Sequence, residues 1–83
     1  MKKIYVGNLP FTTSDADLRQ LFAKHGEVLS ASVVMDRESG RSRGFGFVEM
    51  DTANATSAIA ALDGCDLQGR SLRVNEAEAK KRR

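Results

Sequence analysis

The stretch that decides the fold is Arg43-Gly44-Phe45-Gly46-Phe47-Val48-Glu49-Met50. Successive side chains of a β-strand alternate between its two faces, so both phenylalanines share a face with Arg43 and Glu49. Because Arg and Glu are rarely buried without partners, that face is predicted to meet water. Each exposed Phe forgoes roughly 1.5–3 kcal/mol of burial free energy. This strand therefore presents aromatic rings to a partner outside the fold.

A second strand repeats the pattern at the start of the chain. Over residues 2–7, Ile4 and Val6 share one face, whereas Tyr5 lies on the other face with Lys3. A third aromatic ring is thus predicted on a wet, cationic surface. Flat rings beside cations suit the flat, negatively charged strands of nucleic acids.

Caps and apolar spacing predict the other elements. Ser14 and Asp17 have the spacing of a capping box, and Gly26 can supply the positive φ that ends a helix. Along the second strand, Val33 and Met35 fall on one face by alternation. In chain order, the chain is predicted to form a helix over 14–24, a strand over 28–35, a polar hairpin connection over 36–42, the aromatic strand over 43–50, a helix over 52–62, a loop over 65–69 and a strand over 71–75.

The resulting order is β-α-β-β-α-β, which predicts an α+β, ferredoxin-like sandwich. Right-handed crossovers place the strands in an antiparallel sheet of order 4-1-3-2, with both helices on one face. The two aromatic strands then lie side by side at the centre. We expect one domain over residues 1–78 and a basic tail over residues 79–83 that is mobile.

Composition narrows the classes of function. Four of the 13 Lys and Arg residues lie at 80–83. Residues 1–79 therefore contain nine Lys and Arg and eleven Asp and Glu, which gives this part of the chain a formal charge of −2. Binding on the body must therefore rely on stacking and local charge. The single cysteine, Cys65, excludes an internal disulfide and the usual zinc sites. No signal peptide, membrane span, metal site or cofactor is expected.

Residues 43–50 resemble the eight-residue RNP motif of the RNA-recognition motif (RRM) family, and seven of the eight positions match. Met50 replaces the last aromatic residue but points inward by alternation. Residues 4–9 resemble the companion motif of that family. The likeness is greatest to bacterial single-RRM proteins and to the RRM of glycine-rich RNA-binding proteins, without their glycine-rich tail.

The resemblance implies a role for each ring. Tyr5 and Phe47 would stack on successive bases, Phe45 would pack against the sugars between them, and Arg43 would contact a phosphate. Further contacts implied for the family fall on Lys3, Val34, Arg73, Asn75 and the backbone near Glu76 and Ala77.

The residues also admit other interpretations. The rings could be ordinary core, and Arg43 could form a salt bridge with Glu49 or Asp36. Gly44-Phe45-Gly46 lacks the rest of a phosphate-binding loop, and the 7–11 loop lacks the arginine that an acylphosphatase would need. His25 has no second histidine as a metal partner. No enzymatic activity is predicted.

We therefore expect a monomeric, cytoplasmic protein that binds single-stranded RNA, with weaker binding of single-stranded DNA, as an RNA chaperone or post-transcriptional regulator. The alternative is a protein-binding module on the same fold. The tail at 80–83 would add phosphate contacts, and in a eukaryotic host it would also resemble a nuclear signal.

Overall fold

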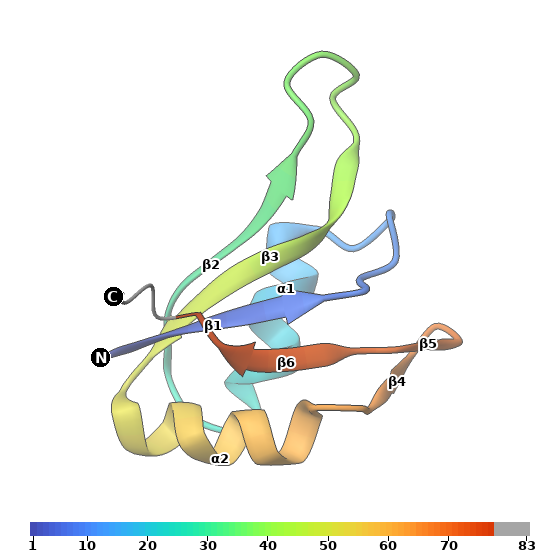
Figure 1. Ribbon diagram of the computed structural model, residues 1–83. Coiled ribbons are helices and arrows are strands. Elements are labelled where there is room, and N and C mark those ends of the chain that lie inside the picture. Colours follow the sequence, from blue (N-terminus) through green and yellow to red (C-terminus); the bar gives the residue numbers. More distant parts are fainter. Residues whose placement is uncertain (78–83) are drawn as a thin grey trace, which may run out of the picture.

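The computed structural model describes residues 1–77, which contain two helices and six strands (Figure 1). The predicted tail at 79–83, with its four basic residues, lies outside the described residues. No helix within residues 1–77 is long and apolar enough to cross a membrane. The elements are β1 (Lys2–Gly7), α1 (Asp15–Ala23), β2 (Val28–Met35), β3 (Ser42–Met50), α2 (Thr52–Leu62), β4 (Asp66–Leu67), β5 (Arg70–Ser71) and β6 (Arg73–Glu76).

Four of these strands form an antiparallel sheet of order β2-β3-β1-β6. This confirms the predicted order 4-1-3-2, with β6 as the fourth strand of the sheet. The aromatic strands β1 and β3 are central neighbours, and Figure 1 shows α1 behind the sheet with α2 along its lower side. One face of β1 and β3 is consequently free of helices.

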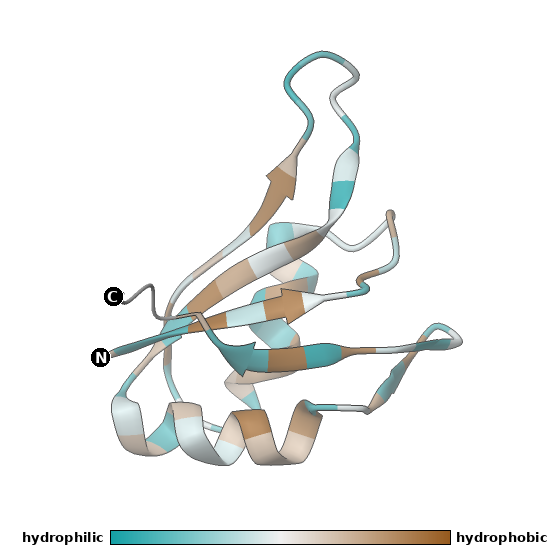
Figure 2. Ribbon diagram, viewed as in Figure 1, coloured by the Kyte–Doolittle hydropathy of each residue, from teal (hydrophilic) through white to brown (hydrophobic). Residues whose placement is uncertain are grey.

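The helices bury the apolar face of the sheet. Hydrophobic and hydrophilic residues alternate along β1 and β6 in Figure 2, as period-two strands require. Met50 is fully buried, which confirms its inward alternation. The buried apolar residues are Ile4, Val6, Leu9, Leu18, Phe22, Val28, Val33, Val48, Met50, Ala55, Ala58, Leu62, Leu72 and Val74.

The N-terminus of α1 is capped as predicted. The Ser14 side chain accepts a bond from the Asp17 backbone N–H, and the Asp17 carboxylate accepts one from the Ser14 backbone N–H, each at 3.1 Å. This is a complete capping box. Gly26 takes a φ of +141°, in line with its predicted role after the helix.

Two details of the strands differ from the sequence prediction. The expected 65–69 loop is part of a small hairpin, in which β4 pairs with β5 across Gln68 and Gly69, both with positive φ. Because Ser71 belongs to this hairpin, the fourth sheet strand begins two residues later than predicted. A register shift between Val33 and Met35 turns Met35 outward, and it is 50% exposed. An extra residue in one strand breaks the alternation beyond it.

Candidate nucleic-acid interface

Three aromatic rings form a cluster on the open face of the sheet, which we call the aromatic platform: Tyr5, Phe45 and Phe47. The ring centroids are 5.9 Å apart for Tyr5 and Phe45, 6.0 Å for Tyr5 and Phe47, and 6.1 Å for Phe45 and Phe47. Each ring is only partly buried. The alternative that these rings belong to the core is therefore wrong.

The backbone sets the positions of the rings. The ladder between β1 and β3 pairs Tyr5 with Phe47 and Gly7 with Phe45. The Tyr5 ring leans along its own strand over Gly7, so that a Cβ at Gly7 would lie 2.5 Å from the tyrosine Oη. Because Gly7 has no side chain, the Tyr5 ring can lie over it, next to Phe45 on the neighbouring strand.

Cations adjoin the platform. The Lys3 ammonium lies 4.8 Å from the centroid of Phe47, within the range of a cation–π contact. Among residues 1–77 the one ion pair joins Lys2 to Glu76 at 3.0 Å. Arg43 thus makes no salt bridge with either acidic residue considered for it, and its side chain is exposed. It is free to meet an anion.

The predicted flanking residues lie around the same face. Asn75 is opposite Tyr5 in the ladder between β1 and β6, and Arg73 is opposite Gly7. Both are exposed, whereas Val34 on β2 is partly buried. The Ala77 backbone N–H donates to the Lys3 carbonyl at 2.9 Å. Since this N–H is already bonded, Ala77 can offer a base only its carbonyl oxygen.

Comparison with known proteins agrees with this geometry. A family model described as "RNA recognition motif" matches residues 4–73. The chain belongs to the RRM family. The match contains all of β3 and β1 from Ile4 onward, and with them the whole aromatic platform.

Relatives of this RRM include proteins of plants and cyanobacteria. It is 60% identical over 82 residues to the 28 kDa chloroplastic ribonucleoprotein of Nicotiana sylvestris, covering 98% of this chain and 30% of that protein. It is 51% identical over 81 residues to RbpA of Synechocystis sp., covering 96% of this chain and 80% of RbpA. The chain thus spans about a third of the chloroplast relative and most of the cyanobacterial one.

A solved structure has nearly the same fold. The crystal structure of RNA Binding Protein PG1 matches with a TM-score of 0.91 and 48% identity, covering 99% of this chain and all of that one. At this identity the likeness extends beyond the fold to the sequence that builds it.

Sequence reasoning missed one aromatic residue near the platform. Phe11, in the loop between β1 and α1, is 66% exposed, and the Arg70 guanidinium lies 5.7 Å from its ring centroid. Phe11 follows Pro10 in a loop and belongs to no alternating or helical pattern of apolar residues, so the sequence does not predict whether its side chain is buried or exposed. The available signal was an aromatic residue in a loop that follows an RNP-like strand.

The hairpin connection between β2 and β3 is ordered around one carboxylate. Asp36 accepts bonds from the backbone N–H groups of Glu38 at 2.8 Å and Ser39 at 3.3 Å. The Glu38 and Ser39 bonds hold the pKa of Asp36 below its ordinary value; desolvation opposes them, and the charge of Arg43 adds to their effect. The hairpin base beside the platform therefore carries an ionised carboxylate at neutral pH.

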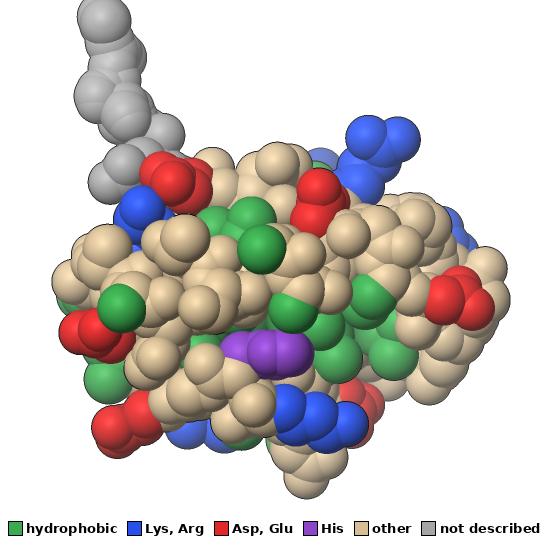
Figure 3. All heavy atoms as spheres, turned by 90° about the horizontal axis from the view of Figure 1, so that it is seen from below, with side chains coloured by type: hydrophobic (Ala, Val, Ile, Leu, Met, Phe, Trp, Pro, Cys, Tyr) green, Lys and Arg blue, Asp and Glu red, His purple; other side chains and the backbone are tan. Residues whose placement is uncertain are grey.

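Other polar residues show no comparable grouping. Cys65 is a free, partly buried thiol. His25 is partly exposed, and Figure 3 shows the histidine beside hydrophobic side chains. Within residues 1–77 no three His, Cys, Asp or Glu side chains are grouped as metal ligands would be.

Proposed function

We propose that this RRM binds single-stranded RNA across the aromatic platform. Tyr5 and Phe47 stack on successive bases, and Phe45 packs against the sugars between them. Arg43 contacts a phosphate. The observation that carries the proposal is the cluster of three mutually packed rings, uncovered at the centre of the sheet.

The physical chemistry of the face sets the strength and specificity of binding. Stacking on an aromatic ring is worth about 1–3 kcal/mol per base and tolerates any base. Two stacks offset the ordering of a flexible strand only in part, so we expect affinities around micromolar and modest sequence preference. Polar side chains at the margin, Arg73 and Asn75, supply what preference there is, while Lys3 and Val34 border the bases. Single-stranded DNA binds more weakly.

The proposed biological role rests on the binding of single-stranded RNA alone and involves no catalytic step. A sheet that holds single strands without strong sequence preference suits an RNA chaperone or post-transcriptional regulator. We propose that the protein acts as a cytoplasmic monomer, with residues 1–78 as the binding module. The basic residues at 80–83 add phosphate contacts.

A titration of labelled oligonucleotides tests the proposal. Single-stranded RNA, single-stranded DNA and duplex RNA are titrated against the wild type and a Phe45→Ala/Phe47→Ala variant at low and at high salt. We expect the variant to lose single-strand binding but to keep its circular dichroism spectrum, because the rings stand outside the core.

Leu21→Ala is the matched control. Leu21 is also a partly buried apolar residue, but it packs against the core from α1, on the opposite side of the sheet. This variant is expected to lose some stability and no RNA affinity. Wild-type RNA binding by the double Phe variant would contradict the proposal and favour the protein-binding alternative.

A further inference from the structure

A row of polar side chains borders the aromatic platform on three adjacent strands. Glu49 of β3 is paired with Ser30 of β2 on one side and with Lys3 of β1 on the other. Phe47 precedes Glu49 by two residues, so the two side chains share the open face and lie about 7 Å apart along the strand. The polar row therefore lies directly beside the ring on which a base would stack.

The carboxylate of Glu49 is oriented by a hydrogen bond from the edge strand. Ser30 Oγ donates to Glu49 Oε1 at 2.9 Å. Lys3 faces Glu49 in the ladder, yet within residues 1–77 the two make no ion pair. The Lys3 ammonium instead lies 4.8 Å from the centroid of the Phe47 ring. The face thus presents an anion and a cation side by side that are not joined in a contact.

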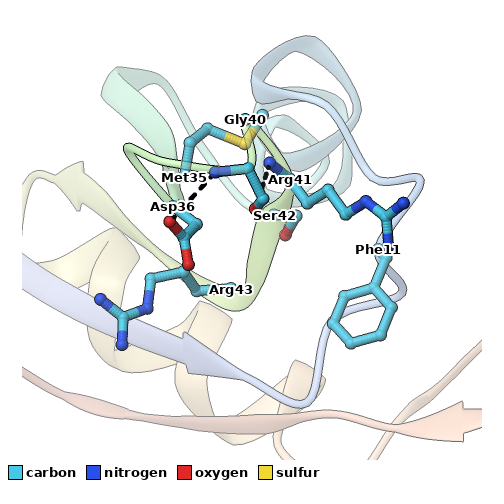
Figure 4. Close-up of a pocket in the computed structure, with 8 residues that line it drawn as sticks. Phe11, Met35, Asp36, Gly40, Arg41, Ser42 and Arg43 are labelled. Carbon is cyan, nitrogen blue, oxygen red and sulfur yellow. Dashed lines mark hydrogen bonds between the residues drawn. The ribbon is translucent and has the colours of Figure 1, made fainter.

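A carboxylate on a face that binds RNA needs a partner of its own, because it repels phosphates. An ionised carboxylate accepts hydrogen bonds and donates none, so the groups it can bind on RNA are the N–H groups of bases. Arg43 lies six residues from Glu49, at the other end of β3, and Figure 4 shows its side chain directed away from Phe11 and Arg41. The Arg43 end of the strand suits the phosphate backbone, and the Glu49 end suits the edge of a base.

Guanine matches this pair of charges better than the other bases do. Its Watson–Crick edge presents the acceptor O6, followed by two donors, N1–H and the N2 amino group. The two donors fit the two oxygens of a carboxylate, and the acceptor fits an ammonium. Uracil has one donor between two acceptors, while adenine and cytosine place an acceptor ring nitrogen next to their amino group. With each of these three bases, one carboxylate oxygen would meet an acceptor.

We propose that Glu49 and Lys3 form a guanine-reading pair for the base that stacks on Phe47. Glu49 accepts from N1–H and from the N2 amino group. The base covers the ring, and the flexible stem of Lys3 lets its ammonium move from the ring to O6. Ser30 is a positioning residue that holds the carboxylate. The inference rests on the proposed function, and it adds one base-specific position to the platform.

The test compares three single-stranded oligouridylates of about six nucleotides, within known site sizes of single-strand binders. One central position carries guanosine, inosine or uridine. Inosine keeps O6 and N1–H but lacks the N2 amino group, so it removes one of the two bonds to Glu49. We expect the wild type to bind the guanosine strand about fivefold or more tightly than the uridine strand, with the inosine strand between them.

Glu49→Gln keeps the shape of the side chain but replaces one acceptor by a donor. We expect this variant to bind the guanosine and inosine strands equally, because the N2 amino group no longer meets an acceptor. Glu27→Gln is the matched control, since it removes the same charge in the connection between α1 and β2, outside the sheet. It should keep the wild-type order of the three strands. Ser30→Ala should reduce the ratio of guanosine to inosine affinity, and Ser30→Thr, which keeps the hydroxyl, should restore it.

The outcomes separate this inference from the proposed function. If the wild type binds all three strands equally, if Glu49→Gln keeps the preference for guanosine, or if Glu27→Gln loses it as well, the guanine-reading pair is refuted while the platform stands. An unchanged ratio in Ser30→Ala would refute the positioning role of Ser30. If Phe45→Ala/Phe47→Ala binds the three strands as the wild type does, the proposed function itself fails.

Discussion

Gly7 lies beneath the Tyr5 ring, so the substitution Gly7→Ala should reduce RNA binding while the protein stays folded. A Cβ there would lie 2.5 Å from Oη, 2.8 Å from Cε2 and 2.9 Å from Cζ of Tyr5. Real Cβ atoms essentially never come closer than 3.0 Å to another heavy atom. The ring must therefore leave its present position. Gly7 is not among the glycines with positive φ, so the backbone itself tolerates alanine.

The magnitude follows from what the displaced ring loses. One base stack is worth about 1–3 kcal/mol, so RNA affinity should fall by about 5- to 150-fold. Tyr5 also loses its contacts with two neighbouring rings, one tilted and one edge-on, each worth about 0.5–1.5 kcal/mol. The smaller entropy of the unfolded chain returns about 0.4–1 kcal/mol. The free energy of unfolding should therefore fall by at most about 2.6 kcal/mol.

Gly46→Ala is the matched control, because it makes the same change on the opposite face of the adjacent strand. A Cβ there would lie 2.5 Å from the Ser32 carbonyl oxygen and 3.0 Å from the Val33 Cα. Both atoms belong to the backbone of β2, so no side chain can swing aside. Overpacking of this kind costs about 1–3 kcal/mol, which lowers the melting temperature by about 5 °C or more in a domain of this size.

The assay is fluorescence anisotropy with a short single-stranded RNA, paired with urea unfolding followed by circular dichroism. We expect Gly7→Ala to remain folded but to lose RNA affinity, and Gly46→Ala to lower the unfolding midpoint while it keeps RNA affinity. Wild-type affinity in Gly7→Ala would refute the reasoning, because a displaced Tyr5 ring would then be shown to contribute no stack.

Three further predictions concern single side chains. Ser14→Ala removes the cap of α1 and should lower the free energy of unfolding by about 1 kcal/mol, as measured in urea. Asp36 has a lowered pKa, chiefly from the Glu38 backbone N–H. Its stabilising effect is therefore present above the pKa of the unfolded chain and is lost as the pH falls through the lowered folded value. Amide exchange should report opening of the hairpin only in that acidic range. Arg43→Ala removes the exposed cation that we propose to contact a phosphate and should reduce the slope of log affinity against log salt by about one, whereas Arg43→Lys should preserve it.

The sequence determines the sheet and its platform well because alternation carries the information. Arg43 and Glu49 mark the wet face of β3, and the same parity assigns Phe45 and Phe47 to it. The partner strand β1 shows the same contrast between Lys3 and its inward neighbours. Where each residue is either clearly polar or clearly apolar, a period of two leaves little choice of face.

The features that the sequence did not predict lie in segments without such an alternating pattern. Each strand of the β4–β5 hairpin has only two residues. Its turn has Gln68 before Gly69, whereas Asn or Asp usually precedes the glycine in such turns. Met35 follows a register shift that no residue type announces. Phe11 is a single ring in a loop, so its exposure is decided by distant residues such as Arg70.

An uncovered aromatic face raises the question of how a small sheet avoids pairing with other chains. Exposed strand edges are the usual route to such association. Here both outer strands have a backbone N–H covered by a carboxylate: Asp15 accepts from Val33 on β2 at 2.7 Å, and Asp63 accepts from Val74 on β6 at 3.1 Å. These two bonds each occupy a donor that an added strand would need. Each edge thus offers one donor fewer to a strand that approaches from the side, while the rings on the open face stay uncovered.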